Sequence, residues 1–231
     1  MNRAGRPQRP ATLWRNHAPA GEAVILPDGC MDLIWTGDDL LVAGPDTVAN
    51  TFRTGRPRDM TGLRFAPGHA PGLLGIPASE FRDLRIRLSD VWPAAEVGRW
   101  SEMLSATDNV GAMLVELCAA RPGEPAPPWI GAATEHLRHG TPVAACADAV
   151  SVSVRTLHRV SLQCFGYGPK TLARILRMRA ALTLITGTGR GLSEVAQHVG
   201  YADYAHMYRE FVELAGAPPT AFTDPDQAGA L

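Results

Sequence analysis

Apolar residues recur at helical spacing in two short segments near the end of the chain. In Leu192–Val199 they return every three or four residues, and Gly200 supplies the positive φ that commonly ends a helix. The second segment begins at about Asp203, a residue type that caps helix N-termini. It places three apolar residues on one face: Met207, Phe211 and Leu214. Two short helices joined by a glycine-containing turn predict a helix-turn-helix, whose second helix enters the major groove of DNA.

The same outline occurs once more, earlier in the chain. Val143–Ala149 is a short apolar helix followed by a turn, and Ser151 or Ser153 caps the next helix. A longer helix is predicted between the two copies, from Pro169 to Thr186, because proline suits a first helical position and Gly187 suits a helix end. The pattern therefore predicts an all-α domain of two helix-turn-helix motifs joined by one connecting helix.

Short strands separated by turns dominate the first half of the chain. Six segments have strand character: Ala23–Leu26, Met31–Trp35, Leu40–Ala43, Val48–Phe52, Thr61–Phe65 and Leu84–Leu88. The second and third are expected to pair as a hairpin through residues 36–39. Helices are expected to follow at Ala70–Leu74, Ser79–Asp83, Ala94–Leu104 and Asp108–Ala120. The predicted class is α+β, with a β-rich N-terminal domain that carries trailing helices, followed by the all-α domain.

Proline-rich segments suggest where the chain divides. Residues 1–10 are rich in Arg and Pro and are predicted to be a disordered tail, and residues 11–120 a sensor or dimerisation domain. Residues 121–128 (RPGEPAPP) are predicted to be a semi-rigid linker, and residues 129–231 the DNA-binding domain. No apolar run approaches the length of a membrane span, and no secretory signal is present, so we expect a cytoplasmic protein without a membrane partner.

The formal net charge is −1, but the basic residues are unevenly distributed. Residues 153–179 contain no Asp or Glu and hold these cations: Arg155, Arg159, Lys170, Arg174, Arg177 and Arg179. Local basicity of this kind is what the neutralisation of phosphates requires. A solvated helical face is the alternative explanation.

Three sequence stretches resemble the DNA-binding domain of the AraC/XylS family of bacterial transcription regulators. They are SVRTLHR (Ser153–Arg159), FGYGPKTLARILR (Phe165–Arg177) and EVAQHVGYADYAHMYREF (Glu194–Phe211). The resemblance covers roughly the last hundred residues, and it implies sequence-specific binding of double-stranded DNA. RNA polymerase, a small-molecule effector and a second copy of the chain are further candidate partners. The N-terminal half, with PDGCMDLIW, resembles a domain of unassigned function often found ahead of AraC-type modules, similar in outline to a truncated cupin-like arm.

The resemblance also implies which residues contact DNA. Family members read base edges from exposed positions in the first turns of each recognition helix. In the first copy these positions are Arg155, His158 and Arg159, and in the second they are Tyr204, His206 and Arg209. The planar fork of arginine can bond both acceptors on a guanine edge.

Some of these positions admit other roles. The first recognition helix has few basic residues after Arg159, so Lys170 and Arg174 are expected to add contacts with the phosphate backbone of the DNA. The alternatives are that Arg159 pairs within the domain and that His206 is only a surface histidine. Arg177 and Arg179 are expected to brace the domain by internal pairing, while Leu157 and Tyr201 are expected in the core.

The N-terminal half offers little support for catalysis. Cys30 lies between Asp28 and Asp32, and nearby carboxylates raise the pKa of a thiol, whereas a nucleophilic cysteine needs a lowered one. No zinc spacing or catalytic motif appears, so we expect no enzyme, catalytic residue, metal or cofactor. A ligand pocket lined by Trp35, Phe65 and His69 is one hypothesis, and simple filling of the core is the other. The alternative overall function is a protein-interaction or enzymatic module whose C-terminal domain no longer binds DNA.

Overall fold

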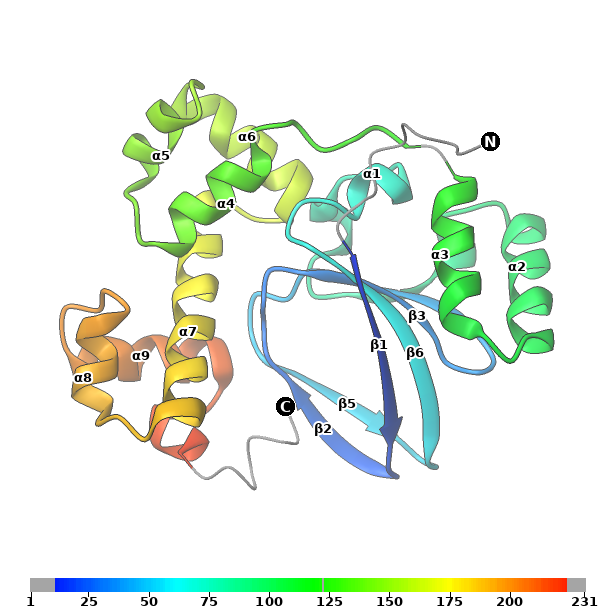
Figure 1. Cartoon of the computed structure of the whole chain (residues 1–231), viewed down its shortest axis with the longest axis horizontal. Helices are drawn as coiled ribbons and strands as arrows, with labels where there is room; N and C mark the ends of the chain where they lie inside the picture. The colour runs from blue at the N-terminus through cyan, green and yellow to red at the C-terminus, as the bar shows by residue number, and fades with distance from the viewer. Residues whose placement is uncertain (1–10, 122, 224–231) are drawn as a thin grey trace.

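Antiparallel strands form the first half of the molecule in the computed structural model, which describes residues 11–121 and 123–223 (Figure 1). A five-stranded sheet has the order β1-β6-β3-β4-β7. Its strands are β1 (Ala11–Ala18), β6 (Arg58–Phe65), β3 (Met31–Trp35), β4 (Leu40–Ala43) and β7 (Arg85–Arg87). A two-stranded sheet pairs β2 (Gly21–Ile25) with β5 (Asn50–Thr54). The predicted tail, residues 1–10, lies outside the described residues.

Alternation along β3 gives the sheet one buried face. Met31, Leu33 and Trp35 are buried, while the residues between them are only half-buried. The predicted hairpin of β3 and β4 is confirmed, with Trp35 opposite Leu40. The core beneath is closed by helices and short 3₁₀ turns: α1 (Pro71–Leu74), η1 (Ala78–Phe81), η2 (Leu88–Asp90), α2 (Ala94–Ala106) and α3 (Val110–Ala120).

The first strand, β1, was not foreseen. Its sequence ATLWRNHA lacks an alternating apolar pattern, because β1 is an edge strand whose side chains are mostly exposed. It pairs with all eight residues of β6. Gly62 of β6 leaves space for the ring of Trp14, whose Nε1 donates to the carboxylate of Asp32 at 2.7 Å. Long-range pairing of this kind has no local signal in the sequence.

Within residues 123–223, the second half contains helices and no strand. It contains α4 (Ile130–Arg138), α5 (Val143–Ala149), α6 (Val154–Phe165), α7 (Pro169–Thr188), α8 (Leu192–His198), α9 (Tyr204–Ala215) and the 3₁₀ turn η3 (Pro219–Phe222). The α+β class and the order of its parts are therefore confirmed, while a likeness to cupin domains stays a prediction. In Figure 1 the helices α4–α6 lie above α8 and α9, and α7 runs from one group to the other. The connecting helix is slightly longer than predicted, because Gly187 is helical and Gly189, at φ +64°, ends it.

The two halves pack against each other through several contacts. Leu26, next to β2, is 5% exposed and belongs to the core of the helical half. The Ala49 amide donates to the carbonyl oxygen of Leu214 at 2.7 Å. A Cβ added at Gly29 would lie 3.1 Å from Leu172. The proline-rich segment thus joins two units in close contact, and a division of the chain there stays a prediction.

Across the part of the chain that the structure describes, no helix is both long enough and apolar enough to cross a bilayer.

Candidate nucleic-acid interface

The first recognition helix, α6, starts at a well-defined cap. Ser153 is the N-cap, and its Oγ accepts the amide of Thr156 at 3.0 Å, whereas Ser151 lies in the preceding turn with φ +57°. Leu157, fully buried as predicted, turns one face of the helix into the core. The opposite face carries the three predicted DNA contacts, all exposed: Arg155, His158 and Arg159.

These three side chains are almost free of internal partners. Arg159 reaches Gln163 of its own helix, with 3.4 Å between Nη1 and Oε1, and within the described residues it makes no ion pair. Arg155 and His158 likewise form no ion pair with any residue that the structure describes. The first copy therefore presents two guanidinium groups and an imidazole to solvent.

The second recognition helix, α9, is built in the same way. Asp203 is the N-cap, as predicted, and its Oδ1 accepts the amide of His206 at 2.6 Å. The predicted inward face is confirmed, since Met207, Phe211 and Leu214 are buried. Of the predicted contacts, Arg209 is exposed, while Tyr204 and His206 are half-buried.

One exposed residue of α9 was missed. Tyr208 is 43% exposed, and its ring packs edge-on against Tyr204 with centroids 6.3 Å apart. The signal was available, because residue 208 lies four positions after Tyr204 and one before Arg209, on the helical face away from the core. Tyr208 thus extends the exposed surface that contains Arg209.

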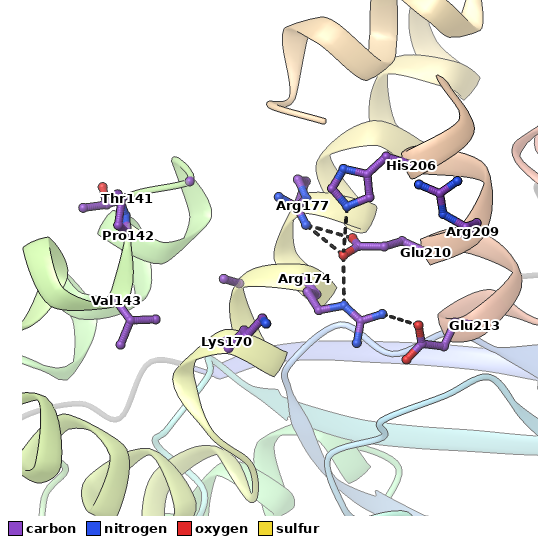
Figure 2. A pocket seen from close by; sticks show the side chains of 12 residues that line it. Thr141, Pro142, Val143, Lys170, Arg174, Arg177, His206, Arg209, Glu210 and Glu213 are labelled. Carbon is purple, nitrogen blue, oxygen red and sulfur yellow. Dashed lines mark hydrogen bonds and ion pairs between the residues drawn. The ribbon is translucent and has the colours of Figure 1, made fainter. Parts of the chain in front are cut away.

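A cleft of about 630 Å³ lies between the two motifs (Figure 2). Its walls are the turn before α5 and the facing sides of α7 and α9. It brings together four of the predicted site residues: Lys170, Arg174, His206 and Arg209. The contacts predicted on α6, including Arg155, do not line this cleft.

A buried carboxylate ties α9 to α7 at the bottom of the cleft. Glu210, with its side chain 9% exposed, accepts Nε of Arg174 at 2.9 Å and Nη2 of Arg177 at 2.9 Å (Figure 2). Arg174 also pairs with Glu213, and Nε2 of His206 lies 3.6 Å from Glu210. The bond from Arg174 lowers the pKa of Glu213 and, in return, raises the pKa of Arg174. These contacts form an ion-pair brace of Arg174, Arg177, Glu210 and Glu213.

The basic residues noted in the sequence differ in whether they take part in the ion-pair brace. The predicted internal pairing of Arg177 is confirmed. Arg179, expected to pair similarly, makes no ion pair within residues 11–121 and 123–223. Arg174 is held by two carboxylates, so a phosphate would have to compete for it, and its contact with DNA stays a prediction. Lys170 is exposed at the start of α7 and forms no ion pair inside the described chain.

The surroundings of Cys30 do not favour a nucleophile. Burial is the main cause that raises the pKa of its thiol, and the carboxylate of Asp28 adds to it. The guanidinium group of Arg64 pairs instead with Asp28 and Asp32. Cys30 and Asp28 border a cavity of about 280 Å³ that α4 and α7 close from the other side. The described residues contain no group of three or more His, Cys, Asp or Glu placed to hold a metal ion.

The hypothetical ligand pocket residues lie apart from both cavities. Trp35 and Phe65 are buried members of the core, opposite Thr61 and Met31 respectively on adjacent strands. His69 is half-buried, and burial lowers the pKa of its imidazole. The burial of the two aromatic rings favours core filling, and a ligand role for these residues stays a prediction.

Part of each half of the chain matches a known family model. Residues 146–224 match a model described as a helix-turn-helix domain, and this range includes both recognition helices. Residues 11–87 match a domain of unknown function (DUF6597), which ends at β7. No curated protein matches the sequence.

Solved structures of similar arrangement come from two bacterial proteins. The C-terminal domain of AraT, a response regulator from Geobacillus stearothermophilus, is 22% identical over 42% of this chain and 85% of its own, with a TM-score of 0.40. Apo ToxT from Vibrio cholerae is 10% identical over 96% of this chain and 98% of its own, with a TM-score of 0.48. ToxT with a bound unsaturated fatty acid is 8% identical over 96% and 97%, with a TM-score of 0.46.

Proposed function

Since this chain is a DNA-binding transcription regulator of the AraC type, we propose that it recognises a specific double-stranded site with both recognition helices. One observation carries the proposal. Two separately capped helices, α6 and α9, each bury one face and present polar side chains on the other: arginines and a histidine on α6, and an arginine and tyrosines on α9. An exposed polar face beyond the cap is the part of a helix-turn-helix that enters the major groove.

The role of each exposed residue follows from the chemistry of its side chain. Arg155, Arg159 and Arg209 carry guanidinium groups suited to a guanine edge or to a phosphate. His158 and His206 can donate to phosphate or base acceptors, and Tyr204 can contact a thymine methyl group or a phosphate oxygen. Lys170, at the edge of the cleft, is suited to a phosphate between the two base-reading segments.

The two motifs present different residues, so they should read different sequences. The connecting helix α7 has 20 residues, and at 1.5 Å per residue it is about 30 Å long. We therefore expect α6 and α9 to enter successive major-groove segments, about one turn or 10 bp apart. One protomer should then protect a non-palindromic site, and a dimer should protect two such sites as repeats.

Selection of bound sequences from random double-stranded DNA with the full chain tests the proposal. The expected product is a bipartite motif, and footprinting should find two groove contacts on one face of the duplex. A motif with a single contact would mean that one of the two helix-turn-helix copies is only structural. Failure to enrich any sequence would reject specific DNA binding and favour an interaction module whose C-terminal domain no longer binds DNA.

We further propose that the N-terminal domain modulates this binding. The support is its direct contact with the helical half through Leu26, Ala49 and Gly29. A small-molecule effector, RNA polymerase and a second copy of the chain are the candidate partners. Repeating the selection with and without candidate metabolites would reveal an effector as a change in affinity or in the selected motif.

A further inference from the structure

One loop of the N-terminal domain contacts the C-terminal ends of both recognition helices. This β4–β5 loop, Gly44–Ala49, follows strand β4 and precedes strand β5. At its start, Pro45 packs against Gly166, the residue that ends α6. At its end, the Ala49 amide donates to the carbonyl oxygen of Leu214 in the last turn of α9, at 2.7 Å.

The contact with α6 leaves no room for a side chain at Gly166. A Cβ added at Gly166 would lie 2.7 Å from Cγ of Pro45 and 3.0 Å from the carbonyl oxygen of Ala78 in η1. Gly166 has φ +80°, so its backbone conformation also favours glycine. The end of α6 is therefore seated between the β4–β5 loop and η1.

The contact with α9 replaces a bond that the helix cannot make for itself. The last four carbonyl groups of an α-helix have no partner within the helix, and Leu214 is the second-last residue of α9. Its carbonyl oxygen receives the Ala49 amide instead. The N-terminal domain thus supplies a partner for one terminal carbonyl group of the second recognition helix.

The loop itself is held rigidly at several points. Asp46 is buried, and its carboxylate accepts Nη1 of Arg85 at 2.9 Å. Thr47 donates its amide to Oδ1 of Asp83 at 2.6 Å and its hydroxyl to Oδ2 at 2.9 Å. The Asp83 amide in turn donates to the carbonyl oxygen of Pro45 at 3.2 Å. These bonds tie the loop to β7 and to the segment around Asp83, between its contacts with the two recognition helices.

From these contacts we infer that the β4–β5 loop sets the spacing between the two recognition helices. The inference rests on the proposed function, because the spacing matters only if both helices contact DNA. The helices are linked through α7 and its ion-pair brace, and the loop adds a second link on the side of the N-terminal domain. A spacing fixed twice makes the protein selective for the number of base pairs between its two half-sites. It also gives the N-terminal domain a direct means of altering that selectivity.

The test uses the full chain and the bipartite site that it selects. Affinity is measured on that site and on versions whose spacer is one base pair longer or shorter. The wild type should lose roughly tenfold in affinity on the altered spacers, the size of one mismatched base pair. Ala49→Pro, which removes the donated N–H, and Pro45→Ala, which removes the ring against Gly166, should both lose most of this discrimination. The matched control is Val48→Ala, since Val48 lies in the same loop and is 47% exposed.

If one of the loop variants folds poorly, hydrogen exchange provides a second test. Hydrogen exchange of the full chain should find the Ala49 amide protected, and Pro45→Ala should speed exchange around Gly166, the residue that Pro45 contacts. Equal spacer discrimination in the folded loop variants and the wild type would overturn the inference, and so would a wild type that tolerates all spacers. In both cases DNA binding itself would stand. A wild type that selects no sequence would instead reject the proposed function and this inference with it.

Discussion

At the scale of single residues, exposure and pairing separate the cations that can bind DNA from those that hold the fold. Arg155, Arg159 and Arg209 are exposed and make no ion pair with any described residue. Arg174 and Arg177 lie on the same basic stretch of sequence as Arg155 and Arg159, yet their guanidinium groups are bound to the buried carboxylate of Glu210. The sequence indicated where the cations are, but only the packing of α7 on α9 decides their partners.

Arg209→Ala should weaken binding to the selected site by about 1–3 kcal/mol and relax the preference at one base pair, if Arg209 reads a base edge. If it contacts only phosphate, the loss should be similar on all sequences, and the slope of affinity against salt should fall by about one. Titrations on specific and nonspecific DNA at several salt concentrations distinguish the two. Arg99→Ala, on the exposed side of α2, is the control. Unchanged affinity in Arg209→Ala would exclude both roles.

Glu210→Gln tests the ion-pair brace. The substitution keeps the shape of the side chain but leaves Arg174 and Arg177 without their shared charge, so unfolding free energy should fall by roughly 1–3 kcal/mol. Glu213→Gln is the matched control, because the side chain of Glu213 is 61% exposed and such surface pairs contribute about 0–1 kcal/mol. Denaturant unfolding measures both variants. Equal unfolding free energies of the two variants would mean that the buried ion pairs of Glu210 stabilise the fold no more than the exposed pair of Glu213.

At the scale of elements, the helices of the two motifs could be predicted closely because their signals are local. α5 has the predicted bounds, and the caps Asp203 and Gly200 are where the sequence placed them. Strand β1 could not be predicted, because its residues pair with residues of β6 that lie 40 to 54 positions further along the chain, and its side chains are mostly exposed. Tyr208 lies on the exposed face of α9 but outside the positions that the resemblance to the AraC/XylS family implies.

Ser153→Ala tests the cap on which the first recognition helix depends. Loss of the bond from the Thr156 amide to Oγ should cost about 1 kcal/mol of stability. The first turn of α6, which contains Arg155, should also fray. Substitutions in the half-site read by α6 should then change the affinity less than in the wild type, while the half-site read by α9 should be recognised as before. Ser193→Ala, an exposed serine early in α8, should change stability by no more than about 0.5 kcal/mol. A Ser153→Ala protein as stable as wild type would show that the Thr156 amide finds another acceptor, such as the hydroxyl of Thr156 itself or a water molecule.

At the scale of the whole molecule, the sequence suggested two units joined by a proline-rich linker. In the structure these units are in direct contact, since Leu26 enters the helical core and the β4–β5 loop contacts both recognition helices. Neither contact has a sequence signal. Leu26 has the apolar character of any strand residue, and Ala49 contributes only its backbone amide. Contacts between distant segments through backbone atoms are what a single sequence leaves open.

Expression of residues 129–231 alone tests how far the helical half depends on the rest. Apart from Leu26, the buried residues of the helical half's core all come from the fragment itself, among them Leu157, Ile175 and Phe211. We therefore expect the fragment to be helical. Without Leu26 the fragment should lose about 2 kcal/mol, the burial of one leucine side chain. Without the Ala49 amide and Pro45, it should also bind its two half-sites with weaker preference for one spacer.

Two variants of the full chain calibrate this result. Leu26→Ala should lower the stability of the helical half by about 2–3 kcal/mol, because it removes the same side chain from the core. Val24→Ala, two residues earlier and 39% exposed, should change it by no more than about 0.5 kcal/mol. Circular dichroism during thermal unfolding gives the stabilities, and affinities on spacer variants give the selectivity. A fragment as stable and as spacer-selective as the full chain would mean that the N-terminal domain contributes neither to the stability of the helical half nor to its spacer selectivity. An unfolded fragment would mean that the two halves form one cooperative unit, and DNA binding would then need the whole chain.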